Sequence, residues 1–311
     1  MTRACLGAMG QKCRKHNILC AGSTKKRLRA ASPATLLASC TLPTCLGIWK
    51  REYGVSFGYG GAVAWSGAHL LSSAAPLPTA AGVHALCLVL YGARLCLFLL
   101  YRERIPFFQK LREKIEERAT SQGGRLNRLP FVLSCSLLYL GLVAPVALAA
   151  LAGQRLSVAG CPVALLFRGC MVAMYAGWVI NAAGDAWKSV RKAVKGDAAL
   201  VTGGPFSLLR HPNYTGEQLM WTANFAAGLA AWLSLQREGL RAGPLGWLAL
   251  SALGYAGIMF VLMQATRSLE RRHREKYGSD SAYGEWVSRT WAGLALPDSS
   301  ASQPAGQAAA A

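Results

Sequence analysis

Long stretches without charged residues limit what this chain can fold into more than any other feature of its sequence. Only Arg94 and Arg168 interrupt the five longest stretches. Each is long enough to cross a bilayer as an α-helix, which needs about 20 mostly apolar residues. A weaker, Gly-rich stretch from Val55 to Pro76 predicts one further span. The expected fold class is therefore all-α, a polytopic membrane protein with about six transmembrane helices. The five stretches are 81–101, 129–154, 156–184, 218–236 and 242–266.

Lys and Arg residues are concentrated in alternate segments between the predicted spans. The formal net charge is +20. The segments 102–128, 185–213 and 267–296 carry eight, five and six Lys or Arg residues, whereas the opposite loops carry none, one and two. This alternation is the positive-inside pattern and places both termini on one side. Topology explains the charge, so no nucleic-acid partner is expected. Segment 102–128 combines both charge signs with Phe107, Phe108, Leu111 and Ile115, and predicts an amphipathic helix on the inner membrane surface.

The first part of the chain is basic and differs in composition from the rest. Residues 1–51 contain ten Lys or Arg residues and no Asp or Glu. This composition, without the apolar core of a secretory signal, predicts an organellar transit peptide over residues 1–45. The alternative is a disordered basic tail. The predicted membrane is that of a plastid or mitochondrion, with the endoplasmic reticulum left open. A transmembrane domain over 46–297 and a disordered tail over 298–311 complete the predicted organisation.

The cysteines do not predict a metal site. Five of the ten lie in the leader and five lie singly in the apolar spans, no CxxC occurs, and the histidines are scattered. They are expected to be small buried side chains, and no metal is expected.

Three groups of polar residues lie at membrane entrances on the same predicted side. The first, Asn181, Asp185 and Lys188, shares one helical face where the fourth span ends. The second lies in "SLLRHPNYTGEQLMW" (residues 207–221), where Pro212 suits a helix start. A helix N-terminus with an Arg beside it favours binding of phosphate or carboxylate. The second group comprises Arg210, His211, Asn213, Tyr214 and Glu217.

The third group lies in the tail that leaves the sixth span. It comprises Glu270, Arg274, Tyr277 and Tyr283. Each group also has a plain structural explanation: an Asp185–Lys188 ion pair, an Arg anchored to lipid headgroups, or a basic helix beside anionic lipid. Their convergence on one side favours a pocket for a large anionic cofactor.

Three segments carry a resemblance to a known superfamily. "GPFSLLRHPNYTGE" (204–217) resembles the C-terminal signature of the steroid 5-alpha-reductase and sterol-reductase superfamily. "NAAGDAWKSVRK" (181–192) is similar to the Asp-x-x-Lys element before that signature, and "ERRHREKYGSDSAYGEW" (270–286) looks like the element after it. The resemblance covers roughly residues 53–297. Isoprenylcysteine carboxyl methyltransferases share the RHPxYxG string, so this string does not distinguish a reductase from a methyltransferase.

The resemblance implies a cofactor, a substrate class and residue roles. It implies NADPH, bound by the three groups, with the nicotinamide directed toward a lipophilic enone-like substrate whose C=C bond is reduced. Membrane lipid is the other expected partner. The alternatives are S-adenosylmethionine-dependent methyl transfer to a lipophilic acceptor and a non-catalytic lipid-binding or assembly protein.

The substrate side departs from the family pattern. Steroid reductases polarise the enone with a Glu and a Tyr from early helices, but the second span offers His84, Tyr91 and Arg94 without a carboxylate. Tyr91, Arg94 and Glu217 are the candidate catalytic residues, with a structural role for Arg94 as the alternative.

Overall fold

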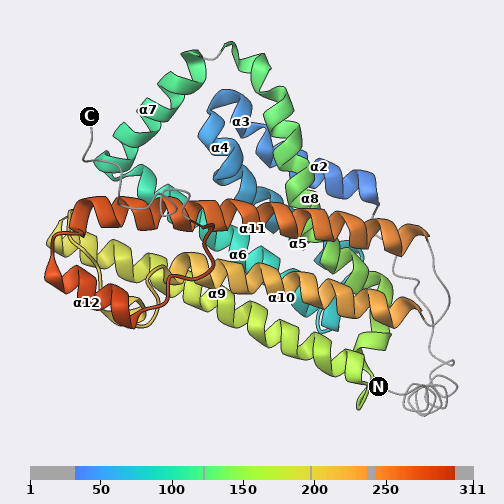
Figure 1. Cartoon of the computed structure of the whole chain (residues 1–311). Helices are drawn as coiled ribbons and strands as arrows, with labels where there is room; N and C mark the ends of the chain where they lie inside the picture. Colours follow the sequence, from blue (N-terminus) through green and yellow to red (C-terminus); the bar gives the residue numbers. More distant parts are fainter. Residues whose placement is uncertain (1–31, 122, 197, 237–241, 298–311) are drawn as a thin grey trace, which may run out of the picture. The chain divides into compact units, whose positions relative to one another are not determined.

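The chain is helical along almost its whole described length (Figure 1). The computed structural model describes residues 32–121, 123–196, 198–236 and 242–297. No strand is assigned within these ranges, and the expected all-α class is confirmed. The helices are α2 (Pro33–Thr44), α3 (Leu46–Trp49), α4 (Arg51–Val55), α5 (Phe57–Ser73), α6 (Ala80–Glu103), α7 (Pro106–Ser121), η1 (Arg125–Arg128), α8 (Leu129–Ala152), η2 (Gly153–Ser157), α9 (Pro162–Lys195), η3 (Gly204–Ser207), α10 (Pro212–Leu235), α11 (Ala242–Tyr277) and α12 (Ser281–Arg289).

Within the described residues, four helical stretches are long and apolar enough to cross a membrane: α6, residues 125–157 around α8, α9 and α11. They coincide with four of the predicted spans, which confirms a polytopic membrane protein. The other two predicted spans are also helical. However, α5 has only 17 residues, and α10 is not among the four. Six spans therefore stays a prediction.

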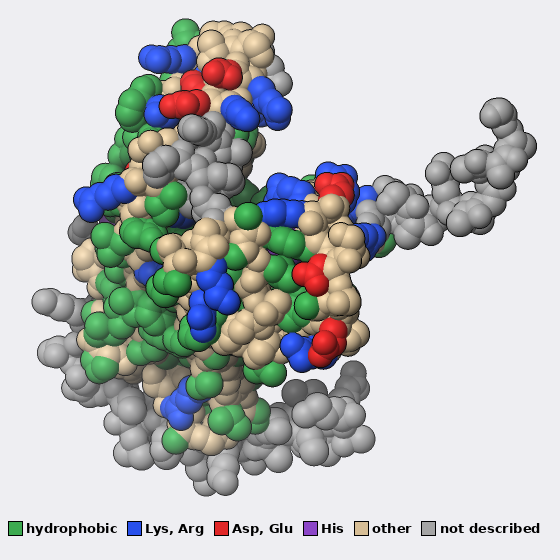
Figure 2. Space-filling view, turned by 90° about the vertical axis from the view of Figure 1, so that its left-hand side faces the viewer, with side chains coloured by type: hydrophobic (Ala, Val, Ile, Leu, Met, Phe, Trp, Pro, Cys, Tyr) green, Lys and Arg blue, Asp and Glu red, His purple; other side chains and the backbone are tan. Residues whose placement is uncertain are grey.

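Large aliphatic side chains stay exposed along the membrane-length helices. Leu165 and Val172 of α9 are 71% and 73% exposed, and Leu253 of α11 is 71% exposed. Figure 2 shows such hydrophobic side chains covering much of one face, with Lys and Arg side chains among them. Water would disfavour this exposure, whereas lipid chains solvate it, so these side chains are expected to face the bilayer.

The chain divides into two compact units whose boundaries fall inside α9, α10 and α11. The first unit runs to Met174 and includes Thr222–Tyr255. The second unit comprises Tyr175–Trp221 and the chain from Ala256 onward. All three polar groups recognised in the sequence belong to the second unit.

The start of the fold requires a correction. Helix α2 lies inside the segment predicted to be a leader, yet it packs against α5 and α8. Its Leu36 and Cys40 are completely buried. Because an apolar helix face is buried here, α2 is part of the folded domain, which therefore includes residues before the predicted boundary at residue 46. Residues 1–31 and 298–311, the remainder of the predicted leader and the predicted tail, lie outside the described residues.

Helix α7 forms within the segment predicted to be amphipathic. Arg112 is 8% exposed and pairs with Glu103 at 2.5 Å, which joins α7 to the end of α6. Ile115 is half-buried. The side chains of Phe107, Phe108 and Leu111 lie outside the description, so contact of this face with a membrane stays a prediction.

A buried polar link connects three helices of the first unit. His84 of α6 and Asn224 of α10 are both almost fully buried, and His84 Nε2 lies 2.8 Å from Asn224 Oδ1. Asn224 Nδ2 also donates to the Leu142 carbonyl of α8 over 2.9 Å. A single amide side chain therefore satisfies one polar group on each of two neighbouring helices.

We expect Asn224→Leu to lower the free energy of unfolding by about 1–2 kcal/mol, because it keeps the volume but leaves His84 and the Leu142 carbonyl without their partner. Thermal unfolding in detergent measures this loss. Ser134→Ala, which removes an exposed hydroxyl from α8, is the control and should leave the melting temperature unchanged. Equal melting temperatures for Asn224→Leu and the natural chain would contradict the prediction.

Candidate functional site

Helices α9 and α10 cross closely at two glycines of the second unit. A Cβ on Gly216 would lie 2.6 Å from the Gly177 carbonyl oxygen and 2.5 Å from the Asn181 backbone nitrogen. At this crossing, Asn181 Nδ2 donates to the Asn213 carbonyl over 2.8 Å. The structure thus brings together Asn181 of the first polar group and Asn213 of the second, as the predicted pocket requires.

Glu270 joins the signature to the tail. Its Oε1 lies 3.1 Å from Arg210 Nε and 2.5 Å from His211 Nε2. Arg210 Nη1 donates to the carbonyls of Val287 and Thr290, at the end of α12, over 2.6 and 2.8 Å. Because Arg210 Nε and Nη1 both donate hydrogen bonds within the protein, Arg210 does not offer a pair of N–H groups for a bidentate hydrogen bond to a phosphate. In this structure it is a clamp between the signature and α12.

His211 is a buried imidazole at the start of α10. Its side chain is 1% exposed, and its carbonyl accepts from the Thr215 backbone N–H over 2.8 Å. Burial lowers the pKa of His211, and the positive charges of Lys188 and Arg210 act in the same direction, while the hydrogen bond with Glu270 opposes them. A neutral ring that donates from Nε2 to the carboxylate has Nδ1 as an acceptor, a tautomer assigned from this hydrogen bond.

An aromatic cluster holds the tail against the loop between α9 and α10. Trp286 is 1% exposed and donates from Nε1 to the Phe206 carbonyl over 2.7 Å. Tyr283 is buried in the same cluster, and burial raises the pKa of its hydroxyl. Tyr277 donates to the Ala198 carbonyl over 2.7 Å. In the structure Tyr283 packs in the cluster and Tyr277 holds the loop, and the cofactor-binding role predicted for both tyrosines stays a prediction.

The segment after α12 runs along the first turns of α10. Gln218 donates to the Leu294 carbonyl over 2.7 Å and accepts from the Leu294 N–H over 3.0 Å. Leu209 and Trp291 form an isolated bridge. This contact was not recognised in the sequence, because a Gln pairing with backbone 76 residues away leaves no periodic signal.

The remaining predicted residues take varied positions in the second unit. Glu217 is half-buried, with Oε1 3.4 Å from Trp221 Nε1. Tyr214 is half-buried, with its ring 6.3 Å from that of His211. Asp185 and Lys188 are half-buried on α9, and Arg274 is exposed on α11.

The two predicted catalytic residues of α6 lie in the first unit. Tyr91 is 1% exposed and donates to the Tyr59 hydroxyl over 3.0 Å. The guanidinium of Arg94 lies 5.1 Å from the centre of the Phe98 ring. These contacts give both side chains a packing role, and their catalytic role stays a prediction.

Buried polar atoms without a partner mark places where a ligand or water atom can bind. In the second unit's described part these atoms are Trp178 Nε1, Trp187 Nε1, Thr215 Oγ1 and His273 Nδ1. His273 was missed in the sequence, although it follows Glu270 by three residues and therefore shares its helix face. Among the residues that the structure describes, no group of three or more His, Cys, Asp or Glu could hold a metal ion.

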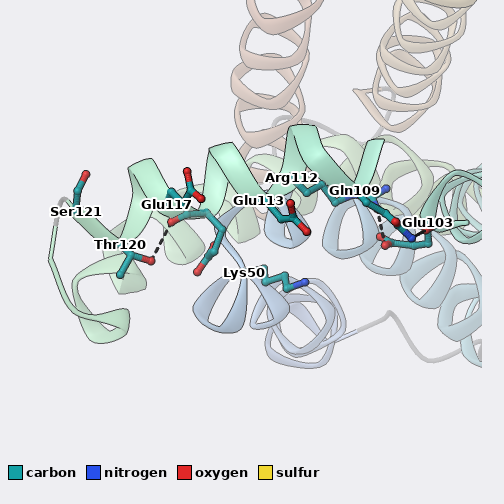
Figure 3. A pocket seen from close by; sticks show the side chains of 9 residues that line it. Lys50, Glu103, Gln109, Arg112, Glu113, Glu117, Thr120 and Ser121 are labelled. Atoms are coloured by element: carbon teal, nitrogen blue, oxygen red, sulfur yellow. Dashed lines mark hydrogen bonds and ion pairs between the residues drawn. The ribbon is translucent and has the colours of Figure 1, made fainter. Parts of the chain in front are cut away.

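A cavity of about 810 Å³ lies elsewhere, in the first unit beside α7 (Figure 3). Four carboxylates and two cationic groups line it, so its charge opposes a polyanionic dinucleotide. We therefore place the candidate site in the second unit, although the volume of this cavity is within the usual range for ligand sites. The lining residues are Lys50, Glu103, Gln109, Arg112, Glu113, Glu116, Glu117, Thr120 and Ser121.

Comparison with known proteins identifies one family. Residues 54–290 match the family model described as a protein of unknown function (DUF1295). No curated protein and no solved structure matches the chain.

Proposed function

The chain belongs to the DUF1295 family, and from that premise we propose that it is an integral membrane oxidoreductase that uses NADPH to reduce a C=C bond of a lipophilic, enone-like molecule. The observation that carries the proposal is that the signature contacts α9 through Asn181 and α11 through Glu270. The resemblance of the signature to steroid 5-alpha-reductases supports the reaction class. The expected partners are a lipophilic small molecule and membrane lipid.

The second unit has groups suited to a dinucleotide. Trp178 and Trp187 of α9 each have a buried indole N–H without a partner, and an N–H can donate only to an acceptor such as a phosphate, hydroxyl or amide oxygen. Lys188 brings positive charge to the same helix. Glu217 and Asn213 would hold ribose hydroxyls or the carboxamide.

Bound NADPH would supply the hydride, and the chain would supply binding, orientation and proton control. In this proposal Asn181 fixes the entry of α10 through the Asn213 carbonyl. Glu270 holds the neutral His211 ring in one tautomer and orientation, so that Nδ1 can accept a hydrogen bond from the cofactor. Arg210 keeps α12 in place and acts on the site through position.

Calorimetric titration of the full-length chain in detergent with NADPH and with S-adenosylmethionine tests the proposal. We expect NADPH to bind, and Glu217→Ala to weaken its binding about tenfold, the usual effect of removing a hydrogen bond from a carboxylate. Glu275→Ala, an exposed carboxylate on α11, should bind like the natural chain. In the same preparation, a steroid enone and an isoprenoid enone are tested for consumption of reduced nicotinamide.

Binding of S-adenosylmethionine without NADPH would overturn the proposal in favour of methyl transfer. Folded protein that binds neither cofactor would overturn it in favour of a lipid-binding or assembly role. We propose that the protein lies in the membrane of a plastid or mitochondrion, with the endoplasmic reticulum as the alternative. Localisation of the full-length chain in cells tests this proposal.

A further inference from the structure

The segment that follows α12 returns to α10 and α11, and we call its residues 292–296 the strap (Figure 1). Gln218 of α10 is 3% exposed, and its side-chain amide donates to the Leu294 carbonyl over 2.7 Å and accepts from the Leu294 N–H over 3.0 Å. The Leu296 N–H donates to the Met263 carbonyl of α11 over 3.4 Å. Hydrogen bonds from two helices of the second unit therefore hold the strap.

The strap lies at the level where α10 and α11 are apolar. Gln218 begins the uncharged stretch 218–236, and Met263 lies in the uncharged stretch 242–266. The strap itself contains no charged residue. Non-helical backbone at membrane depth is tolerated where it is buried in protein or lines a cavity, because lipid chains cannot satisfy its polar groups. The position of the strap therefore suits contact with a molecule that arrives through the lipid.

A polar atom without a partner lies beneath the strap. Thr215 Oγ1 is buried and forms no hydrogen bond with the described part of the chain. A Cβ on Gly293 would lie 2.6 Å from this oxygen and 3.1 Å from Gln218 Oε1, so the Gly293 backbone covers both side chains. Thr215 and Gln218 are three residues apart and share a face of α10. A buried hydroxyl without a partner is uncommon and points to an atom from outside the chain, which would reach Thr215 after the strap moves.

The strap is held in a way that allows it to open. Leu294 is 46% exposed, so its side chain contributes little packing. Gly293 has a φ of 83°, a left-handed conformation that glycine adopts easily. The chain just before the strap is fixed separately, because the Arg210 N–H donates to the Trp291 carbonyl over 2.8 Å. Segments with few buried apolar contacts open at low free energy. The strap can therefore open about Gly293 while Trp291 stays in place.

We propose that the strap is a lid over a binding site on α10 for the oxygen atom of a lipophilic molecule. When the lid opens, the Thr215 hydroxyl and the Gln218 amide can both donate to a ketone or hydroxyl oxygen. When it is closed, the Leu294 backbone occupies the amide and competes with that molecule. The inference rests on the proposed function for the class of molecule and deepens it, because it assigns the place where the molecule binds and the element that controls access.

Gly293→Ala tests the lid, because it disfavours the closed strap without removing a group from the proposed site. The new Cβ would meet Thr215 and Gln218, and alanine disfavours the left-handed conformation. We expect the strap amides of the full-length chain in detergent to exchange hydrogen about tenfold faster, as measured by mass spectrometry. Equilibrium binding of radiolabelled cholestenone should tighten by a similar factor, because a larger fraction of the protein is open. Gly284→Ala, where a Cβ would meet nothing within 4 Å, should change neither result.

A second comparison tests the groups that bind the oxygen. Cholestene has the skeleton of cholestenone without the ketone oxygen. We expect the natural chain to bind cholestenone more tightly than cholestene. Thr215→Val keeps the shape of the side chain but removes its hydroxyl, and should reduce this preference about fivefold, the effect of losing one hydrogen bond.

The results distinguish the lid from the proposed function. Faster exchange of the strap in Gly293→Ala without tighter binding of cholestenone would show that the strap is only structural, and the inference would be wrong. Equal binding of the two steroids by the natural chain, or binding of neither, would also overturn it. NADPH titration of the natural chain is measured without steroid, so each of these outcomes leaves cofactor binding standing. Loss of the proposed function, shown by folded protein that does not bind NADPH, would leave the exchange and steroid results as they are.

Discussion

Glu270→Ala is expected to lower the free energy of unfolding by about 3 kcal/mol, because it leaves two largely buried basic side chains without their shared acceptor. Arg210 and His211 are 15% and 1% exposed, and both place a nitrogen on Glu270 Oε1. Loss of that oxygen also frees Arg210 from one of its anchors, so α12 should loosen. Thermal unfolding in detergent and limited proteolysis of the tail measure the two effects.

Two variants show whether the effect belongs to this carboxylate. Glu275→Ala removes a carboxylate from the same helix, where it pairs with Arg271 at 3.9 Å and both side chains are more than half exposed. Such a surface pair contributes at most about 1 kcal/mol, so Glu275→Ala should melt close to the natural chain. Glu270→Gln keeps an acceptor oxygen without the charge and should fall between the two. Equal stability of all variants would mean that the Glu270 contacts do not hold the unit together.

The fold class could be predicted from the sequence because it depends on composition over long stretches. Four predicted spans match membrane-length helices, since about 20 apolar residues have few other stable arrangements. That α2 belongs to the folded domain could not be found in this way. Helix α2 is short and follows a basic segment, and what marks it as folded is the burial of Leu36 and Cys40 against α5 and α8. Burial between distant segments leaves no local pattern.

The candidate site shows the same division between local and distant effects. Helical spacing placed Asn181 on the α9 face that contacts Asn213 of the signature, and Glu270 contacts Arg210 and His211. Their roles in a cofactor site stay predictions. The spacing could not show that Arg210 would turn toward the carbonyls of Val287 and Thr290, because those acceptors come from backbone about 80 residues away. His273 was overlooked for a related reason. A histidine in a run of basic residues resembles a surface residue until its ring contacts are known.

The second large effect is expected at the crossing of α9 and α10. Gly177→Ala should destabilise the chain by about 3 kcal/mol, since adding a methyl group to a full interface forces the backbone to move. The new Cβ would lie 2.6 Å from both the Gly216 carbonyl oxygen and the Met220 backbone nitrogen. These are backbone atoms of α10, so no side-chain rotation can relieve the clash.

Separation of α9 from α10 would also disturb the site, because Asn181 and Asn213 meet at this crossing. We therefore expect Gly177→Ala to weaken NADPH binding together with stability. Gly169→Ala is the matched control on the same helix, where a Cβ would meet nothing within 4 Å. This control should unfold no earlier than the natural chain, because alanine favours the helix more than glycine does. Similar melting temperatures for the two variants would show that α9 and α10 do not pack at Gly177, and the convergence on which the proposed function depends would lose its support.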